Sequence, residues 1–423
     1  MSGSSIKRIG LRSTALLTVF GLALVQPAQS AERVKTPERG SFTVTEAAAA
    51  KPDGFAARVR IPGDDPAAFA RLVADARAAA QPWLVLSGGG ENGAFAAGLL
   101  KGWSEAGTRP DFGVITGVST GAMIAPFAFI GPSGDEALRQ AYTEISAADV
   151  FEFGGTSESL TDTWPLKRRI DRSVTPKLLQ AVAAEHAKGR RLLVATTAVD
   201  SERPVLWDMG AIAGTGGPKA LALFRDIILA SSAVPGVFPP VMVEAVAGSK
   251  RIQEMHDDGG TTAPYYLAPE ATLLAAHPAP LPAQRVYLVV NNVLTPQFQM
   301  AARTTLGVLG RSMSAAIKAQ MRAALALSRG FARRTGLDLR VAEIDGRFTQ
   351  TTTAPFDQAY MKALFAHGES LGRDGTAFAG DDGTPESGRS AGATDLPAVS
   401  LTGVGGLRTS AAGEAAAQDL AGR

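Results

Sequence analysis

The sequence predicts an α/β fold: a parallel-rich sheet flanked by helices, in three layers. The first observation is that short, continuously apolar runs alternate with stretches of helical spacing. Strands that are apolar on both faces are typical of a parallel sheet covered by helices on each side. The second observation is composition, because 45% of the 423 residues are hydrophobic and 19% are charged, which is enough apolar material for a large core.

The predicted strands follow one another along the chain with helical stretches between them. Five apolar runs are each expected to form a strand: Trp83–Leu86, Phe112–Val118, Arg191–Thr196, Arg285–Val290 and Leu339–Ile344. Helices are expected at Ala94–Ala106 and at Pro176–His186, the second with Thr175 as its N-cap. An Ala-rich helix is expected to open at Asp65-Pro66 and to end near Ala80.

Composition along the chain divides it into four segments. They are a signal peptide at 1–30, a leader with a helix at 31–80, the main domain at 81–372, and a low-complexity tail at 373–423. Within the main domain, residues 151–175 have no clear period and are interpreted as a surface loop or lid. The tail has few large apolar residues, so it is expected to remain disordered.

The first thirty residues have the order of a secretory signal peptide. Three basic residues precede the apolar run Ala15–Val25, and the small residues Ala28 and Ser30 follow it. A helix of that length would cover only about 16 Å of a bilayer core of about 30 Å. We therefore expect export to the periplasm or out of the cell, with cleavage after Ser30. No later segment is long and apolar enough to suggest a transmembrane span.

Charge and residue usage exclude several classes of function. The net charge is +2 without a long Lys/Arg run, which argues against nucleic acid as the main partner. The chain has no cysteine, so disulfide scaffolds, thiol nucleophiles, zinc knuckles and iron–sulfur clusters are excluded. With only four histidines, a histidine-rich metal site is not expected either. We predict neither a cofactor nor a metal.

A glycine-rich loop joins the first predicted strand to the first helix of the main domain. Trp83–Leu86 runs into Ser87-Gly88-Gly89-Gly90-Glu91-Asn92-Gly93, an arrangement whose backbone N–H groups favour a negative charge. A dinucleotide site would need an acidic residue at the end of the next strand, and a phosphate-binding P-loop would need Lys and Ser/Thr after Gly93; neither is present. An oxyanion hole and a plain tight turn remain open.

The next strand ends in a G-x-S-x-G motif. Gly117-Val118-Ser119-Thr120-Gly121 lies between the strand Phe112–Val118 and a helix that begins near Ala122. A serine in such a sharp strand-to-helix turn has strained backbone angles, and only small residues fit two positions before and after it. The turn would place the Ser119 hydroxyl at a helix N-terminus, as a nucleophile requires.

A candidate base for that serine lies far downstream. His256-Asp257-Asp258-Gly259-Gly260 would put a carboxylate at a turn that a second loop can approach closely. From these five residues alone, Asp258 is either the base or part of a solvated Asp-Gly turn.

Taken in order, the glycine loop, the elbow Gly117-x-Ser119-x-Gly121 and Asp258-Gly259-Gly260 resemble the motifs of the patatin-like phospholipases. The block Ala230–Pro240 and the stretches Leu193–Asp200 and Pro204–Gly210 add to the resemblance, which covers about Trp83 to Gly372. The family is one of lipid acyl hydrolases with a three-layer α/β fold. The resemblance therefore implies a carboxylic ester hydrolase acting on lipids or other acyl esters, including lipids held in a membrane surface.

The resemblance also implies residue roles. Ser119 would be the nucleophile and Asp258 the sole base, as a Ser–Asp dyad, while Gly88, Gly89 and Gly90 would supply the oxyanion hole. Two departures stand out. The family commonly has Arg or Lys where this chain has Asn92, and its Asn-x-Pro after the DGG triplet is replaced by Thr261-Thr262-Ala263-Pro264.

Two other functions remain open. One is an esterase of the α/β-hydrolase type with a Ser–His–Asp triad, which needs a histidine such as His256 or His367 near Ser119. The other is a binding protein without catalytic activity on the same fold, for which the departure at Asn92 leaves room.

Overall fold

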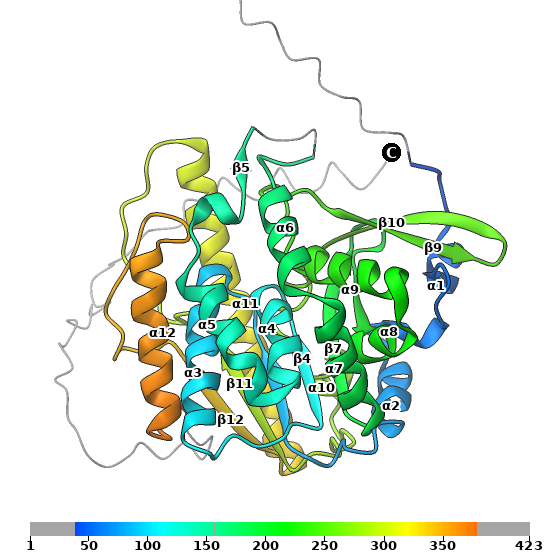
Figure 1. The fold of residues 1–423 in the computed structure, drawn as a ribbon, viewed down its shortest axis with the longest axis horizontal. Helices are drawn as coiled ribbons and strands as arrows, with labels where there is room; N and C mark the ends of the chain where they lie inside the picture. The colour runs from blue at the N-terminus through cyan, green and yellow to red at the C-terminus, as the bar shows by residue number, and fades with distance from the viewer. Residues whose placement is uncertain (1–38, 155–157, 379–423) are drawn as a thin grey trace, which may run out of the picture. The chain divides into compact units, whose positions relative to one another are not determined.

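The computed structural model describes residues 39–154 and 158–378, and it confirms the α/β fold. A sheet of ten strands runs in the order β1-β9-β10-β7-β4-β3-β11-β12, and β8 and β2 branch from β7 (Figure 1). Its parallel part consists of β3 (Trp83–Leu86), β4 (Val114–Gly117), β7 (Arg191–Ala198), β11 (Arg285–Val290) and β12 (Asp338–Glu343). These are the five strands that the apolar runs predict, each within two residues of its predicted ends.

The other half of the sheet is antiparallel and was not predicted from the sequence. Its strands are β1 (Lys51–Pro52), β2 (Arg60–Pro62), β8 (Arg203–Asp208), β9 (Val241–Ala247) and β10 (Lys250–Asp258). Polar residues interrupt most of these strands, so they lack the continuous apolar runs that mark the parallel ones. The described part of the leader, residues 39–80, contributes β1 and β2 to the sheet.

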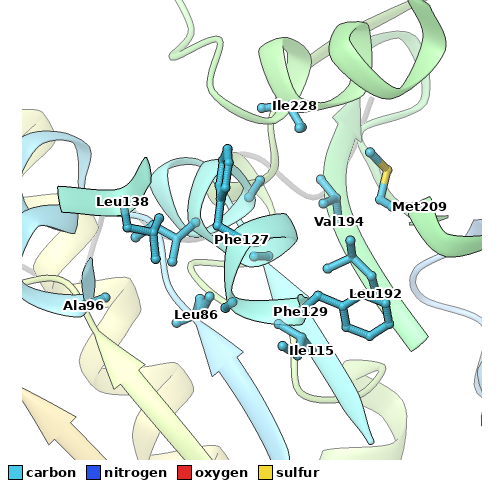
Figure 2. Close-up of a cluster of buried hydrophobic side chains, with 14 of the residues drawn as sticks. Leu86, Ala96, Ile115, Phe127, Phe129, Leu138, Leu192, Val194, Met209 and Ile228 are labelled. Atoms are coloured by element: carbon cyan, nitrogen blue, oxygen red, sulfur yellow. The ribbon is translucent and has the colours of Figure 1, made fainter. Parts of the chain in front are cut away.

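Helices cover both faces of the sheet and make the three layers. Along β3, Leu84 and Leu86 pack into one core, whereas Trp83 and Val85 pack into the other. Figure 2 shows part of the first core, where Leu86 and Ile115 of the sheet lie together with Phe127 and Phe129. The helices on that side are α3 (Gly93–Glu105), α4 (Thr120–Phe129), α5 (Asp135–Thr143), α6 (Trp164–Ser173), α7 (Pro176–Ala187), α8 (Met209–Thr215), α9 (Gly217–Ser231) and α12 (Gln358–Arg373). On the other side lie α2 (Pro66–Ala74), α10 (Glu270–Leu274) and α11 (Thr305–Thr335).

Two local predictions were wrong. Helix α2 ends at Ala74 and not near Ala80, because the backbone beyond it turns so that the N–H of Ala78 bonds the carbonyl of Gly189. The described residues of the segment 151–175 are not all loop, because they include the short pair β5 (Glu152–Phe153) and β6 (Thr161–Asp162), followed by α6. Leu166 and Ile170, one helical turn apart, are the buried face of α6. Charged residues surround Leu166 and Ile170 in the sequence, so the helical spacing of these two apolar residues was not recognised.

Helices α3 and α12 approach so closely that glycine is required where they meet. A Cβ on Gly98 would lie 2.0 Å from the carbonyl oxygen of Phe365, and one on Gly102 would lie 1.9 Å from that of Glu369. Gly368 and Gly372 of α12 make the reciprocal approaches to α3. The close pairing positions α3, whose N-terminus carries the glycine loop.

The ends of the chain include predictions that lie outside the described residues. These are the signal peptide at 1–30 and, from residue 379 onward, the low-complexity tail. In the first part described, α1 (Val44–Ala49) precedes β1. None of the helices in the described ranges combines the length and the apolar character that a membrane span needs.

Candidate active site

Strand β7 brings Ser119 and Asp258 together. Its first half pairs with β4, ending at Gly117 opposite Val194, and on the same edge its second half pairs with the end of β10, with Asp258 opposite Thr196. The C-terminal ends of β4 and β10 therefore face each other along the same edge of β7. Because Ser119 comes two residues after Gly117, it reaches the level of Asp258. The register of the sheet thus brings Ser119 close to Asp258.

Ser119 has the strained backbone that its motif predicts. Its φ is 55° and its ψ is −123°, at the start of α4. A Cβ on Gly117 would lie 2.4 Å from the carbonyl oxygen of Gly121, and one on Gly121 would lie 2.4 Å from that of Leu86. Both elbow glycines are therefore required by close backbone contacts.

The Ser119 hydroxyl lies near enough to the buried carboxyl group of Asp258 to lower the pKa of that group. The N–H of Gly260 donates to Oδ1 of the same carboxyl group over 2.7 Å. Burial raises the pKa of Asp258 to about 7, while the nearby Ser119 hydroxyl and the hydrogen bond from Gly260 oppose the rise and the charge of Asp257 adds to it. Close packing also requires glycine at the next position, since a Cβ on Gly259 would lie 2.4 Å from the carbonyl oxygen of Ala195.

The glycine loop lies against the serine. A Cβ on Gly88 would lie 3.2 Å from Cβ of Ser119, and Gly90 lines the same cavity as Ser119. The N–H of Gly88 is already engaged, since it donates to the carbonyl of Pro264 over 3.0 Å. The N–H groups of Gly89 and Gly90 have no acceptor within the described residues. Gly89, at φ 157°, and Gly90, at φ 58°, give the loop the conformation that turns it over the serine.

Sequence reasoning missed two polar residues that support this geometry. Asn291 is fully buried, donates twice to Ser87 (2.8 and 3.0 Å) and accepts the N–H of Ala96 (3.2 Å), so it fixes both ends of the glycine loop. Its position directly after β11, at the carboxyl edge of the sheet, could have revealed it. Ser231 accepts the N–H of Ser119 over 3.0 Å and donates to the carbonyl of Ala195 over 2.7 Å.

Asn92, where the family commonly has Arg or Lys, forms a hydrogen bond with a neighbouring helix. Its Oδ1 accepts a hydrogen bond of 2.8 Å from the hydroxyl of Tyr360 on α12. The neighbouring Glu91 accepts the N–H of Phe356 over 2.5 Å, and burial raises the pKa of this carboxyl group. The glycine loop is therefore tied to the segment that leads into α12.

An apolar cavity of about 130 Å³ opens at Ser119. This is close to the volume of a buried apolar cavity that holds benzene, about 150 Å³. Arg169 is a charged residue of the lining, and its guanidinium lies 3.9 Å from Asp149. The apolar wall includes Met123, Phe127, Leu138, Leu166, Ile170 and Phe238. The segment interpreted as a loop or lid thus forms part of this wall through α6.

The four histidines have other surroundings. His256 is buried in β10, where it shares a hydrogen bond of 3.0 Å with Thr196 and its ring packs on Trp207. His367 packs on Phe95 and Phe348, His186 lies 3.7 Å from Asp208, and His277 is exposed. Among the described residues, none of them forms a hydrogen bond with Ser119 or Asp258.

Comparisons with known proteins match part of the chain to a protein family. Residues 84–269 match the model of the family described as patatin-like phospholipase. No curated protein matches the chain. A crystal structure of VipD from Legionella pneumophila is similar at 12% identity and a TM-score of 0.31. The alignment covers 70% of this chain and 67% of that chain, and a similarity this low supports no conclusion about this protein. Residues 84–269 are therefore similar to a patatin-like phospholipase domain, and this match supports lipid acyl hydrolase activity in general.

Proposed function

We propose that the protein is a serine lipid acyl hydrolase that cleaves acyl esters of phospholipids or related lipids through a Ser119–Asp258 dyad. The observation that carries the proposal is that the sheet register brings Ser119 close to Asp258, a buried carboxyl group whose pKa is raised to about 7. A free aspartate, with a pKa of about 3.9, is a weak base for serine at neutral pH. Because burial raises the pKa of Asp258 to about 7, this carboxylate would be a much better base for serine at neutral pH.

The chemistry follows from the contacts. Oγ of Ser119 attacks the ester carbonyl carbon as Asp258 accepts the hydroxyl proton. The N–H groups of Gly89 and Gly90 stabilise the negative oxygen that forms, while Gly88 shapes the loop beside the serine. Protonated Asp258 then returns the proton to the leaving alcohol. Water, deprotonated by the same carboxylate, releases the acyl group from Ser119.

The apolar cavity at Ser119 supports an acyl substrate. Its wall offers aliphatic and aromatic side chains, and burying methylene groups there is worth about 0.8 kcal/mol each. The surroundings of the histidines do not support a Ser–His–Asp triad. The contact between Ser119 and Asp258 also speaks against a binding protein that has lost its catalytic residues.

Substitution of the two residues tests the proposal. Ser119→Ala and Asp258→Asn should each lower hydrolysis of a short-chain ester by roughly a thousandfold or more, and the double variant should be little worse, because the pair acts as one unit. As the control, His256→Gln and His367→Gln together should keep most of the activity. Loss of about a hundredfold in that histidine variant, with circular dichroism unchanged, would favour the triad instead.

We also propose that the chain is exported through residues 1–30. The order of basic, apolar and small residues supports this, and cleavage after Ser30 would leave every described residue in place. N-terminal sequencing of the exported protein should read from Ala31. An intact Met1 in that fraction would contradict export by cleavage.

A further inference from the structure

An exposed aromatic surface lies next to the cavity that holds Ser119. Phe153 on β5 is 76% exposed, Leu160 beside β6 is 48% exposed, and Trp164 at the start of α6 is 42% exposed. Strands β5 and β6 pair Phe153 with Thr161, so these side chains belong to one small structural unit. In Figure 1 this unit projects at the top, above α6. We name Phe153, Leu160 and Trp164 the aromatic edge.

A row of rings connects the aromatic edge to the cavity. The ring centroids of Phe153 and Phe151 are 5.4 Å apart, and Phe151 lies 6.2 Å from Phe238 and 6.3 Å from Phe356. Phe238 and Phe356 both line the cavity. Apolar surface therefore continues from solvent to the reacting serine.

The outer face of α6 is basic. Its buried side, Leu166 and Ile170, lines the cavity, whereas Lys167, Arg168 and Arg172 are exposed. The Arg168 guanidinium lies over the Trp164 ring, 5.0 Å from its centroid. A helix with basic side chains on its outer face and an aromatic residue at its end is typical of proteins that bind the bilayer interface.

We propose that the aromatic edge docks the protein on a phospholipid surface, with Phe153 and Trp164 in the headgroup region and Arg168 against lipid phosphate. The row of rings would then open the cavity toward the acyl chains. The alternative occupant, a protein partner, is less favoured because tryptophan beside arginine suits an interface of apolar chains and phosphates. The proposed hydrolase function explains why the protein would dock on lipid, and in that respect the proposal rests on it. Docking itself requires no catalysis.

Trp164 provides a built-in probe of docking. The other three tryptophans, Trp83, Trp103 and Trp207, are buried. In the Ser119→Ala variant, which leaves the lipid intact, vesicles of phosphatidylcholine and phosphatidylglycerol should shift the emission to shorter wavelength, and brominated phosphatidylcholine should quench it. Trp164→Phe in the same background should abolish both effects. Unchanged emission at every lipid concentration would overturn the proposal.

Phe153→Ser tests the surface itself, with Val44→Ser as the matched control. Val44 is 86% exposed on α1, a helix that packs beside β9 and away from the cavity. Phe153→Ser should weaken vesicle binding in sedimentation by roughly tenfold or more, and Val44→Ser should not, because only Phe153 would leave water on docking. Equal binding of the two variants would contradict the docking surface.

Hydrolysis separates this proposal from the proposed function. With Ser119 intact, Phe153→Ser should cleave a soluble short-chain ester as fast as the unaltered protein but should cleave vesicle lipids more slowly. If the unaltered protein binds vesicles and cleaves no ester, the proposed function fails and docking stands. If it cleaves esters and vesicles leave Trp164 unchanged, docking fails and the hydrolase stands.

Discussion

Asp258 determines the pH dependence expected at the scale of single residues. Because burial raises the pKa of this carboxyl group to about 7, the proposed base would be protonated in acid and unable to accept the Ser119 proton. We expect kcat/KM for a soluble ester to rise roughly tenfold per pH unit up to about pH 7 and to level off above it. A profile that stays flat from about pH 5 to pH 8 would show that Asp258 is not the base.

The same shift implies a cost in stability. The folded protein holds a proton on Asp258 up to about pH 7, whereas the unfolded chain loses it near the ordinary value of 3.8, so stability falls as pH rises between these values. Asp258→Asn removes this loss and keeps an oxygen that can accept the N–H of Gly260. We expect its free energy of unfolding at pH 8 to exceed that of the unaltered protein by about 1–4 kcal/mol, with a smaller gain at pH 4.

Urea denaturation at the two pH values measures this difference. A gain in stability at neutral pH together with lost activity would identify Asp258 as a residue kept for function at the expense of stability. A variant less stable than the unaltered protein at pH 8 would contradict the raised pKa.

At the scale of elements, the hydrogen bond from Tyr360 on α12 to Asn92 holds the glycine loop. Tyr360→Phe removes it, and we expect kcat to fall about 3–10-fold, in line with a net hydrogen-bond contribution of about 0.5–1.5 kcal/mol. KM should change little, because the loop acts on the charge that forms during reaction. Tyr265→Phe is the control, since it loses a bond of 2.9 Å to Ser328 on the other side of the sheet. Equal kcat in the two variants would show that the hydrogen bond from Tyr360 to the glycine loop does not contribute to catalysis.

The packing of α3 on α12 leads to a second expectation at this scale. Gly98→Ala would place a methyl group 2.0 Å from the carbonyl oxygen of Phe365, so the helices must separate. Overpacking of this kind typically costs about 1–3 kcal/mol. Gly310→Ala in α11 meets open space and should be neutral or stabilising by up to about 1 kcal/mol. Thermal denaturation compares the two, and equal midpoints would contradict the close approach.

At the scale of the whole molecule, the parallel half of the sheet was predictable and the antiparallel half was not. Strands such as β3 and β11 are buried on both faces, so their apolar runs mark them. In β10 only Ile252 and Met255 are apolar, and no local pattern shows that the strand pairs with β7. Helix α6 was missed because only its inner side is apolar.

The site was predictable in its parts and not in its assembly. The elbow around Ser119 follows from local spacing, since close backbone contacts require both flanking glycines. The pairing of Ser119 with Asp258 depends on how β4 and β10 share β7, a relation between distant segments that only the family resemblance suggested. Asn291 and Ser231 act through buried hydrogen bonds, which no spacing in the sequence reveals.

Reaction with an organophosphorus probe that labels activated serines tests the central claim most directly. Mass spectrometry of the whole protein and of its peptides should find one adduct, on Ser119, at pH 8, and the Asp258→Asn variant should be labelled at least about a hundredfold more slowly. Labelling at another residue would contradict the account, as would an Asp258→Asn variant that reacts as fast as the unaltered protein.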